Sequence, residues 1–141
     1  MPVLTAASMA PALDVVIPVY NEAGNIEAAL AEIADKLHVD HRISVVYDSE
    51  EDNTLPFLRE RVKKQANLRL LRNRYGKGVL NAIRTGLEEV SAEVGLVMMA
   101  DLSDDLVNVD LMYAKAREGY HIVCGSRYMK GGRQLGGPLL K

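Results

Sequence analysis

Strand-forming runs alternate with helical patterns along most of this sequence, and this alternation restricts the fold more than any other feature. Strands are predicted over residues 14–19, 42–47, 68–71, 95–100 and 120–124, with apolar residues at helical spacing between them. Such alternation is typical of a parallel α/β sheet, because helices connect successive strands through right-handed crossovers. We therefore predict a doubly wound, mostly parallel sheet with helices on both faces and all strand ends at one edge.

Local signals mark where helices begin and end. The polar residues 52–54 predict one helix start, and Pro56 is compatible with the first turn that follows. Asn108 is the predicted cap of the last helix, and Gly119 is the expected terminator of that helix.

Composition indicates one soluble globular domain. Of the 141 residues, 48% are hydrophobic and 26% are charged, which is enough for a core and its polar surface. The net charge of −2 argues against a nucleic-acid partner. Cys124 is the only cysteine, which excludes an internal disulfide and favours a reducing, cytoplasmic location. We expect an N-terminal tail at 1–13, the folded domain at 14–128 and a flexible end at 129–141.

Polar residues follow the end of each predicted strand. In an open α/β sheet these positions meet at one rim, where ligands bind. They supply acids for a metal, a glycine turn that lets a ligand approach the main chain, and basic side chains for anionic oxygens. This combination suits a metal-bound diphosphate. The segments of polar residues that follow the five predicted strands are 20–22, 48–52, 73–78, 101–105 and 125–127.

Five motifs in these positions carry a specific resemblance. Residues 14–128 resemble the donor-binding domain of family 2 glycosyltransferases with the GT-A fold, and look most like dolichyl- or polyprenyl-phosphate sugar transferases. The order and spacing of the motifs agree with that family. They are VVIPVYNEAGNI at 15–26, VVYDSEEDNT at 45–54, NRYGKGVLNAIRTG at 73–86, MADLSDD at 99–105 and GSRY at 125–128.

The resemblance implies a nucleotide pocket along the first two motifs. It assigns Pro18, Tyr20 and Glu22 to the base and ribose, which need a flat wall and polar edges. Asp48 matches the second acid of the family's DDGS segment, which contacts the base, whereas Tyr47 replaces the first acid. The alternative for Asp48 is an ordinary loop or cap acid at the end of a strand.

The GKG turn implies contacts to the donor phosphates. Gly76 permits close approach of a ligand to the main chain, and Lys77 offers a point charge to phosphate oxygens. The alternative is an ordinary strand-to-helix turn with a solvated lysine. Neither a Walker loop nor a GxGxxG sequence is present.

The MADLSDD segment resembles the DxD-type metal motif. Asp101 is the matching acid, and Ser103 is the implied second ligand for Mg²⁺ or Mn²⁺. Met99 replaces the first acid of the motif, and a thioether cannot serve a hard cation, so we expect weak or substrate-dependent metal binding. Asp104 and Asp105 are either substitute ligands or caps of the following helix.

The GSRY segment implies a role in catalysis. Arg127 is expected near the donor and acceptor phosphates, so Asp101 and Arg127 are the predicted catalytic residues. Residues 131–141 resemble the mobile loop after GSRY, and in the family the chain continues with acceptor-binding parts. We therefore expect a chain truncated after its donor-binding half, with the C-terminal part of the fold missing.

The predicted function is a glycosyltransferase that moves a sugar, with inversion, from a UDP- or GDP-linked donor to polyprenyl phosphate. The cytoplasmic membrane face is the expected place of the reaction. The alternative is a catalytically silent nucleotide-binding or interaction domain. A receiver domain is disfavoured, because Asn21 and Glu22 stand where its acid pair is expected. Uncovered sheet edges invite pairing, so a homo-oligomer is a hypothesis to test.

Overall fold

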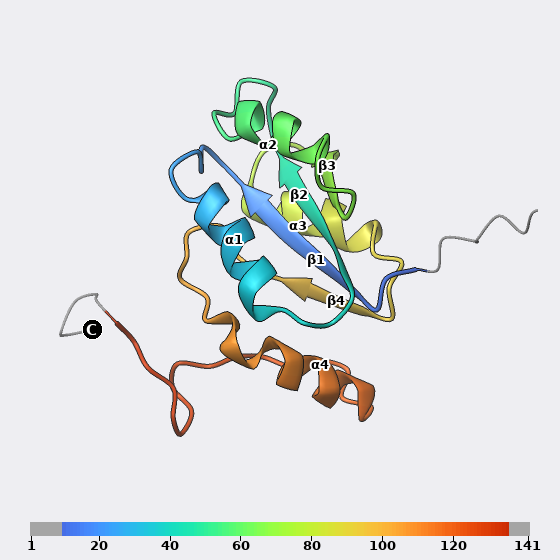
Figure 1. Cartoon of the computed structure of the whole chain (residues 1–141), viewed down its shortest axis with the longest axis vertical. Helices are drawn as coiled ribbons and strands as arrows, with labels where there is room; N and C mark the ends of the chain where they lie inside the picture. Colours follow the sequence, from blue (N-terminus) through green and yellow to red (C-terminus); the bar gives the residue numbers. More distant parts are fainter. Residues whose placement is uncertain (1–9, 136–141) are drawn as a thin grey trace, which may run out of the picture.

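The sheet of this protein is parallel and has four strands in the computed structural model, which describes residues 10–135. Its strands are β1 (Leu13–Val19), β2 (His41–Tyr47), β3 (Leu68–Arg72) and β4 (Val94–Val97). They lie side by side in the order β3-β2-β1-β4, and all three pairings are parallel (Figure 1). This arrangement confirms the predicted parallel sheet. Most of the expected N-terminal tail and the end of the 129–141 segment lie outside the described residues.

Helices follow the strands as the alternation predicts. They are α1 (Ile26–Lys36), α2 (Leu55–Val62), α3 (Val79–Glu88) and α4 (Val109–Arg117), and a 3₁₀ turn, η1 (Leu106–Asn108), precedes α4. Within residues 10–135 no helix is long and apolar enough to cross a membrane.

Helices cover both faces of the sheet because successive side chains of a strand point to opposite sides. On one face, Val16 of β1 and Val46 of β2 pack with Ala82 of α3. The other face holds the larger core against α1, α2 and α4. The sheet is therefore doubly wound, as predicted. The larger core includes Leu13, Val15, Ile17, Val19, Ile26, Leu30, Ile33, Leu58 and Val109.

A buried carboxylate ties β1 to the residues that precede β4. Asp14 is fully buried and accepts hydrogen bonds from the backbone amides of Ser91, at 2.8 Å, and Ala92, at 2.9 Å. Arg42 of β2 donates to both oxygens of the same carboxylate, at 2.8 and 2.9 Å. Burial alone would raise the pKa of Asp14, but these hydrogen bonds and the Arg42 charge lower it below its ordinary value.

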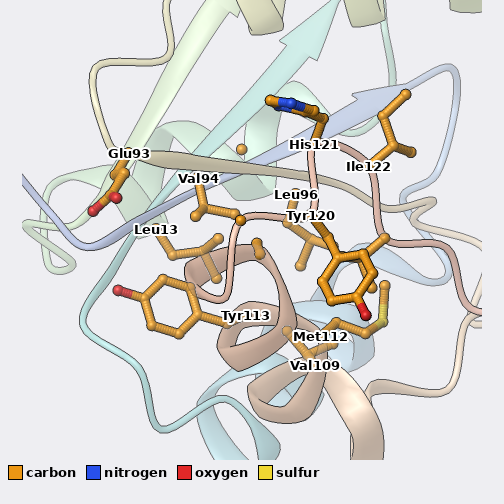
Figure 2. A pocket seen from close by; sticks show the side chains of 14 residues that line it. Leu13, Glu93, Val94, Leu96, Val109, Met112, Tyr113, Tyr120, His121 and Ile122 are labelled. Carbon is orange, nitrogen blue, oxygen red and sulfur yellow. The ribbon is translucent and has the colours of Figure 1, made fainter.

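The predicted fifth strand at 120–124 does not form in the described residues. This segment has no strand hydrogen bonds, and Ile122 is 82% exposed. A cavity of about 460 Å³ lies between Tyr120–Val123 and the outer edge of β4, so the two segments do not pair (Figure 2). A β-propensity pattern forms a strand only where a partner edge is within hydrogen-bonding distance, and here the cavity separates the two.

Smaller differences concern element ends. The predicted strand at 95–100 is shorter, because only Val94–Val97 pair as a strand. Asn108 occupies the cap position of α4, but its side chain makes no capping hydrogen bond. The end of that helix agrees with the prediction, since α4 stops at Arg117 and Gly119 has a φ of 104°.

Candidate functional site

The order of the strands defines where a ligand can bind. From β1 the chain moves outward to β2 and β3, and then returns to place β4 on the other side of β1. The strand order therefore reverses at β1, and in open α/β sheets ligands bind beyond the carboxyl ends of the strands at such a reversal. The rim at the carboxyl ends of the strands is the candidate site.

Pro18 stands near the carboxyl end of β1 without disturbing the sheet. The carbonyl of Val16 accepts a hydrogen bond from the amide of Met98, so the even-numbered residues of β1 direct their backbone groups toward β4. At Pro18 the β4 strand has already ended at Val97, and the missing N–H of proline removes no bond of the strand ladder. Pro18 is thus buried near the carboxyl end of β1, two residues before the exposed Tyr20.

The loop after β1 is held by the loop after β2. The backbone amides of Asn21, Glu22 and Ala23 donate hydrogen bonds to the side chains of residues 52–54. Asn21 has a φ of 55°, and the preceding Tyr20 is 70% exposed. This part of the rim therefore presents an aromatic ring to solvent on a loop that side chains of a second loop fix in place.

Asp48 connects the loop after β2 with the glycine turn. One carboxylate oxygen accepts from the Asn73 side-chain amide at 2.7 Å, and the other accepts from the backbone amide of Gly78 at 2.9 Å. Asn73 also donates to the carbonyl of Gly76 at 2.6 Å. Asp48 thus fixes the turn that carries Lys77, and its predicted contact with a base stays a prediction.

The glycine turn needs residues without a side chain. Gly76 has a φ of 86° and Gly78 has a φ of 125°, a region that strains other residues. An added Cβ at either glycine would meet nothing within 4 Å, so backbone conformation rather than crowding requires glycine here. Lys77 between them is exposed. The turn can therefore offer a cation and accessible main chain to a ligand.

The residues after β4 form a compact acidic turn. Asp101 is exposed and accepts a hydrogen bond from the amide of Ser103 at 3.0 Å, and its hydrogen bonding to Ser103 lowers its pKa. The carboxylate is therefore ionised at neutral pH and points its charge to solvent. Leu102 between these two residues has a φ of 61°, which keeps them in a tight turn.

The two following acids accept hydrogen bonds from backbone amides, and only Asp105 caps the following helical turn, as one of the two sequence interpretations expects for both. Asp104 accepts from the amide of Met99 at 2.8 Å, and Asp105 accepts from the amide of Val107 at 3.0 Å at the start of η1. Within residues 10–135, no three His, Cys, Asp or Glu side chains are close enough to hold a metal ion by themselves.

Arg127 is not brought to the rim by a strand, because the predicted strand before it does not form. Its guanidinium carbon lies 5.8 Å from the centre of the Tyr128 ring. In Figure 1 the orange-to-red segment after α4 lies on the side of α4, apart from the tips of β1 and β2. Its role at the phosphates stays a prediction.

The cavity beside β4 is separate from this rim. Its lining includes Leu13 and Val94, the first residues of their strands, and therefore lies toward the opposite end of the sheet (Figure 2). The lining is mainly apolar, with Met112 and Tyr113 of α4 below the sheet. It offers no set of converging charges for a diphosphate.

Three polar residues make hydrogen bonds within the site that the sequence does not predict. Asp52 was expected at the rim and, with Thr54, at the start of α2, but the hydrogen bonds of both side chains to the loop after β1 were not foreseen. Asn73 was grouped with the rim, but its contacts to Asp48 and Gly76 were not foreseen. The role of Asn73 could have been predicted from the sequence, because a polar residue directly after a strand indicates a rim position. The contacts of Asp52 and Thr54 could not, because hydrogen bonds between loops distant in sequence leave no local pattern.

The comparison with protein families decides the identity of this chain. A model described as Glycosyl transferase family 2 matches residues 14–139. The chain belongs to this family. The predicted family assignment is therefore confirmed.

Curated relatives of this family 2 chain are sugar transferases. It is 33% identical to dolichol-phosphate mannosyltransferase of Pyrococcus furiosus over 122 residues, which cover 86% of this chain and 34% of that protein. It is 30% identical to undecaprenyl-phosphate 4-deoxy-4-formamido-L-arabinose transferase of Pseudomonas savastanoi over 118 residues, which cover 79% and 34%. The chain thus spans about a third of the length of the curated relatives it matches.

Solved structures confirm the predicted GT-A fold. Mannosyltransferase PcManGT from Pyrobaculum calidifontis, in complex with GDP-Man and Mn²⁺, superposes with a TM-score of 0.57 at 26% identity over 67% of this chain and 28% of that one. TarS from S. aureus gives a TM-score of 0.62 at 20% identity over 77% and 33%, a similarity of fold alone.

Proposed function

We propose that this family 2 chain binds a nucleoside-diphosphate sugar at the rim, and that its protein transfers the sugar to a polyprenyl phosphate. The observation that carries the proposal is the set of side-chain hydrogen bonds that joins the loops after β1, β2 and β3 into one rim. The printed names of the relatives support the substrate class, because they pair a sugar with dolichol or undecaprenyl phosphate.

Different residues of the rim bind different parts of the nucleotide-sugar donor. Tyr20 offers an exposed ring as a wall for the base, and Glu22 offers a carboxylate to the ribose. Pro18, buried two residues before Tyr20, is the proposed apolar support beneath the base. Asp48 holds the glycine turn so that Lys77 faces the diphosphate. The solved complex of PcManGT with GDP-Man supports a nucleotide-sugar donor for this fold.

Asp101, with Ser103, is the proposed ligand pair for Mg²⁺ or Mn²⁺. The residues fit such a cation, because an ionised carboxylate stands exposed in a tight turn and Mg²⁺ sites often use one or two carboxylates with substrate phosphates. The bound cation would neutralise charge that develops on the leaving diphosphate. The solved PcManGT complex contains Mn²⁺ beside the nucleotide sugar.

The proposed reaction needs no general base on this chain. An oxygen of the lipid phosphate is already ionised at neutral pH and attacks the anomeric carbon of the sugar. The new bond joins that carbon to the lipid phosphate, while the bond to the donor diphosphate breaks and the nucleoside diphosphate leaves with the electron pair. Attack from the opposite face inverts the anomeric carbon. Lys77 and Arg127 would hold the phosphates, at the cytoplasmic membrane face.

A transfer assay tests this function. The 141-residue chain is incubated with radiolabelled GDP-mannose or a UDP-sugar, MnCl₂ and polyprenyl phosphate in detergent, and the lipid product is separated by chromatography. Labelled lipid that disappears in Asp101→Ala supports the proposal. Donor binding without any lipid product contradicts the transferase function and favours the alternative of a catalytically silent nucleotide-binding domain. Met99, which replaces an acid of the metal motif, is the observation that supports this alternative.

A further inference from the structure

The loop that carries Tyr20 and Glu22 depends on two buried side chains of another loop. The backbone amide of Asn21 lies 3.2 Å from each carboxylate oxygen of Asp52. The next amide, that of Glu22, donates to the hydroxyl oxygen of Thr54 at 2.9 Å. Two consecutive amides of the rim are therefore satisfied by side chains more than 30 residues away in the sequence.

Asp52 and Thr54 form a rigid unit. Asp52 is 5% exposed and Thr54 is fully buried. The backbone amide and the hydroxyl of Thr54 both donate to one oxygen of Asp52, at 2.8 and 2.6 Å. Burial with satisfied hydrogen bonds fixes both side chains in one arrangement, since each alternative arrangement leaves a buried polar group unpaired.

The loop needs this support because its conformation is uncommon. Asn21 has a φ of 55°, in the left-handed region that side-chain-bearing residues seldom adopt, although asparagine adopts it more readily than most. The side chain of Asn21 accepts a hydrogen bond from the amide of Asn53 at 3.2 Å, so the contact between the two loops is reciprocal. Without the oxygens of Asp52, the backbone at Asn21 is free to relax, and Tyr20 and Glu22 move with it.

We propose that Asp52, supported by Thr54, is a positioning residue for the nucleotide part of the donor. Neither residue touches the ligand. They hold the amides of Asn21 and Glu22, and through these the backbone that sets the direction of the Tyr20 ring and the Glu22 carboxylate. This inference rests on the proposed function, and one arm of its test is independent of that function.

Amide hydrogen exchange tests the positioning directly. Asp52→Asn keeps the oxygen that accepts from Thr54 and that also lies 3.2 Å from the Asn21 amide. It replaces the second acceptor of the Asn21 amide with an NH₂ group, so two donors face each other, and it removes the negative charge of the carboxylate. Thr54→Val removes the acceptor for Glu22, whereas Thr54→Ser keeps it. In Asp52→Asn, we expect the backbone amides of Asn21 and Glu22 to exchange at least tenfold faster than in the wild type. In Thr54→Val, we expect the same increase for the Glu22 amide. Exchange of the Ile17 amide in β1 should be unchanged in both variants. Thr54→Ser and the exposed control Asp35→Asn should exchange like the wild type.

Two exchange results overturn the inference. Unchanged exchange at Asn21 and Glu22 shows that the hydrogen bonds do not hold the loop. A uniform increase that includes Ile17 shows that Asp52 and Thr54 only stabilise the whole fold. Should Asp52→Asn fail to fold, the comparison of Thr54→Val with Thr54→Ser decides between these results and the expected one.

Calorimetric titration with GDP-mannose and UDP-glucose in MnCl₂ links the loop to the pocket. The Kd of the nucleotide sugar is expected to rise about tenfold in Asp52→Asn and Thr54→Val, and to stay within twofold of the wild type in Thr54→Ser. Equal affinity in all variants despite faster exchange overturns the inference. A wild-type chain that binds neither sugar contradicts the proposed function, and the exchange results then decide the inference alone.

Discussion

Gly86 of α3 lies so close to Val16 of β1 that a Cβ atom at Gly86 would be 2.2 Å from a methyl carbon of Val16. The same Cβ would lie 3.2 Å from a methyl group of Val46 in β2. Real atoms do not approach to 2.2 Å, so α3 reaches its place on the sheet only because residue 86 has no side chain.

Gly86→Ala should therefore destabilise the fold. Forcing a methyl group into a filled core costs about 1–3 kcal/mol. Chemical denaturation followed by circular dichroism measures the free energy of unfolding. Gly24→Ala is the matched control, because an added Cβ at Gly24 meets nothing within 4 Å. Equal stability of the two variants would show that α3 shifts without cost.

Asp14→Asn should weaken the fold at neutral pH and less so in acid. The pKa of Asp14 is lowered in the folded state from its ordinary value of 3.8, so its contribution to stability is present above that value and is lost as the pH falls through the folded pKa. We expect a loss of about 1–3 kcal/mol at pH 7 from the impaired hydrogen bonds to Ser91, Ala92 and Arg42.

Denaturation of wild type and Asp14→Asn at pH 7, 5, 4 and 3 measures this difference. The gap in the free energy of unfolding should stay constant from pH 7 to 5 and shrink below pH 4. A gap that grows in acid would mean that the carboxyl group is favoured in its protonated form when the protein is folded.

Asp48→Asn should loosen the glycine turn. Asparagine has one acceptor oxygen, so it cannot accept from both the Asn73 side-chain amide and the Gly78 backbone amide, as the two oxygens of Asp48 do. Hydrogen exchange at Gly78 should become faster, while exchange at the β2 residue Val45 stays unchanged. Exchange at Gly78 that stays as slow as in the wild type would show that the turn does not depend on Asp48.

Lys77→Ala should weaken binding of the diphosphate part of the donor. Loss of one charge-assisted contact of about 1.5–3 kcal/mol predicts at least a tenfold rise in Kd for a nucleoside diphosphate. Titration with the corresponding nucleoside, which lacks phosphates, should give equal affinities for variant and wild type. Lys64→Ala, at an exposed lysine beyond the C-terminal end of α2, is the matched control. A tenfold loss with Lys64→Ala as well would indicate a general effect of charge.

The sequence predicts the elements with strong local patterns and misses those that depend on distant partners. The run from Asp14 to Val19 is apolar, ends in polar residues and becomes the central strand. Residues 120–124 carry a similar pattern, but their strand needs a neighbouring edge, and a cavity lies there instead. A local sequence pattern therefore indicates a tendency to form a strand, whereas hydrogen bonding to a neighbouring strand decides whether the strand forms.

The candidate site likewise has one part that the sequence predicts and one part that depends on contacts between distant segments. The motifs around Tyr20, Asp48 and Lys77 could be placed at one rim from the parallel topology alone. The contacts of Asp52 with Asn21 could not, because they join loops whose relative position only the folded sheet determines. Arg127 lacks the predicted strand before it, and its place at the phosphates stays a prediction.

Isothermal titration calorimetry measures directly whether this chain binds a nucleotide sugar. The 141-residue chain is titrated with GDP-mannose and with UDP-glucose, each with MnCl₂ and with EDTA, and the same titrations are run on Asp101→Ala and on the control Asp35→Asn. We predict binding of at least one donor in MnCl₂, weakened about tenfold or more by EDTA or Asp101→Ala and unchanged in Asp35→Asn. No binding of any donor by the folded wild-type chain, or equal binding by Asp101→Ala, would contradict the account.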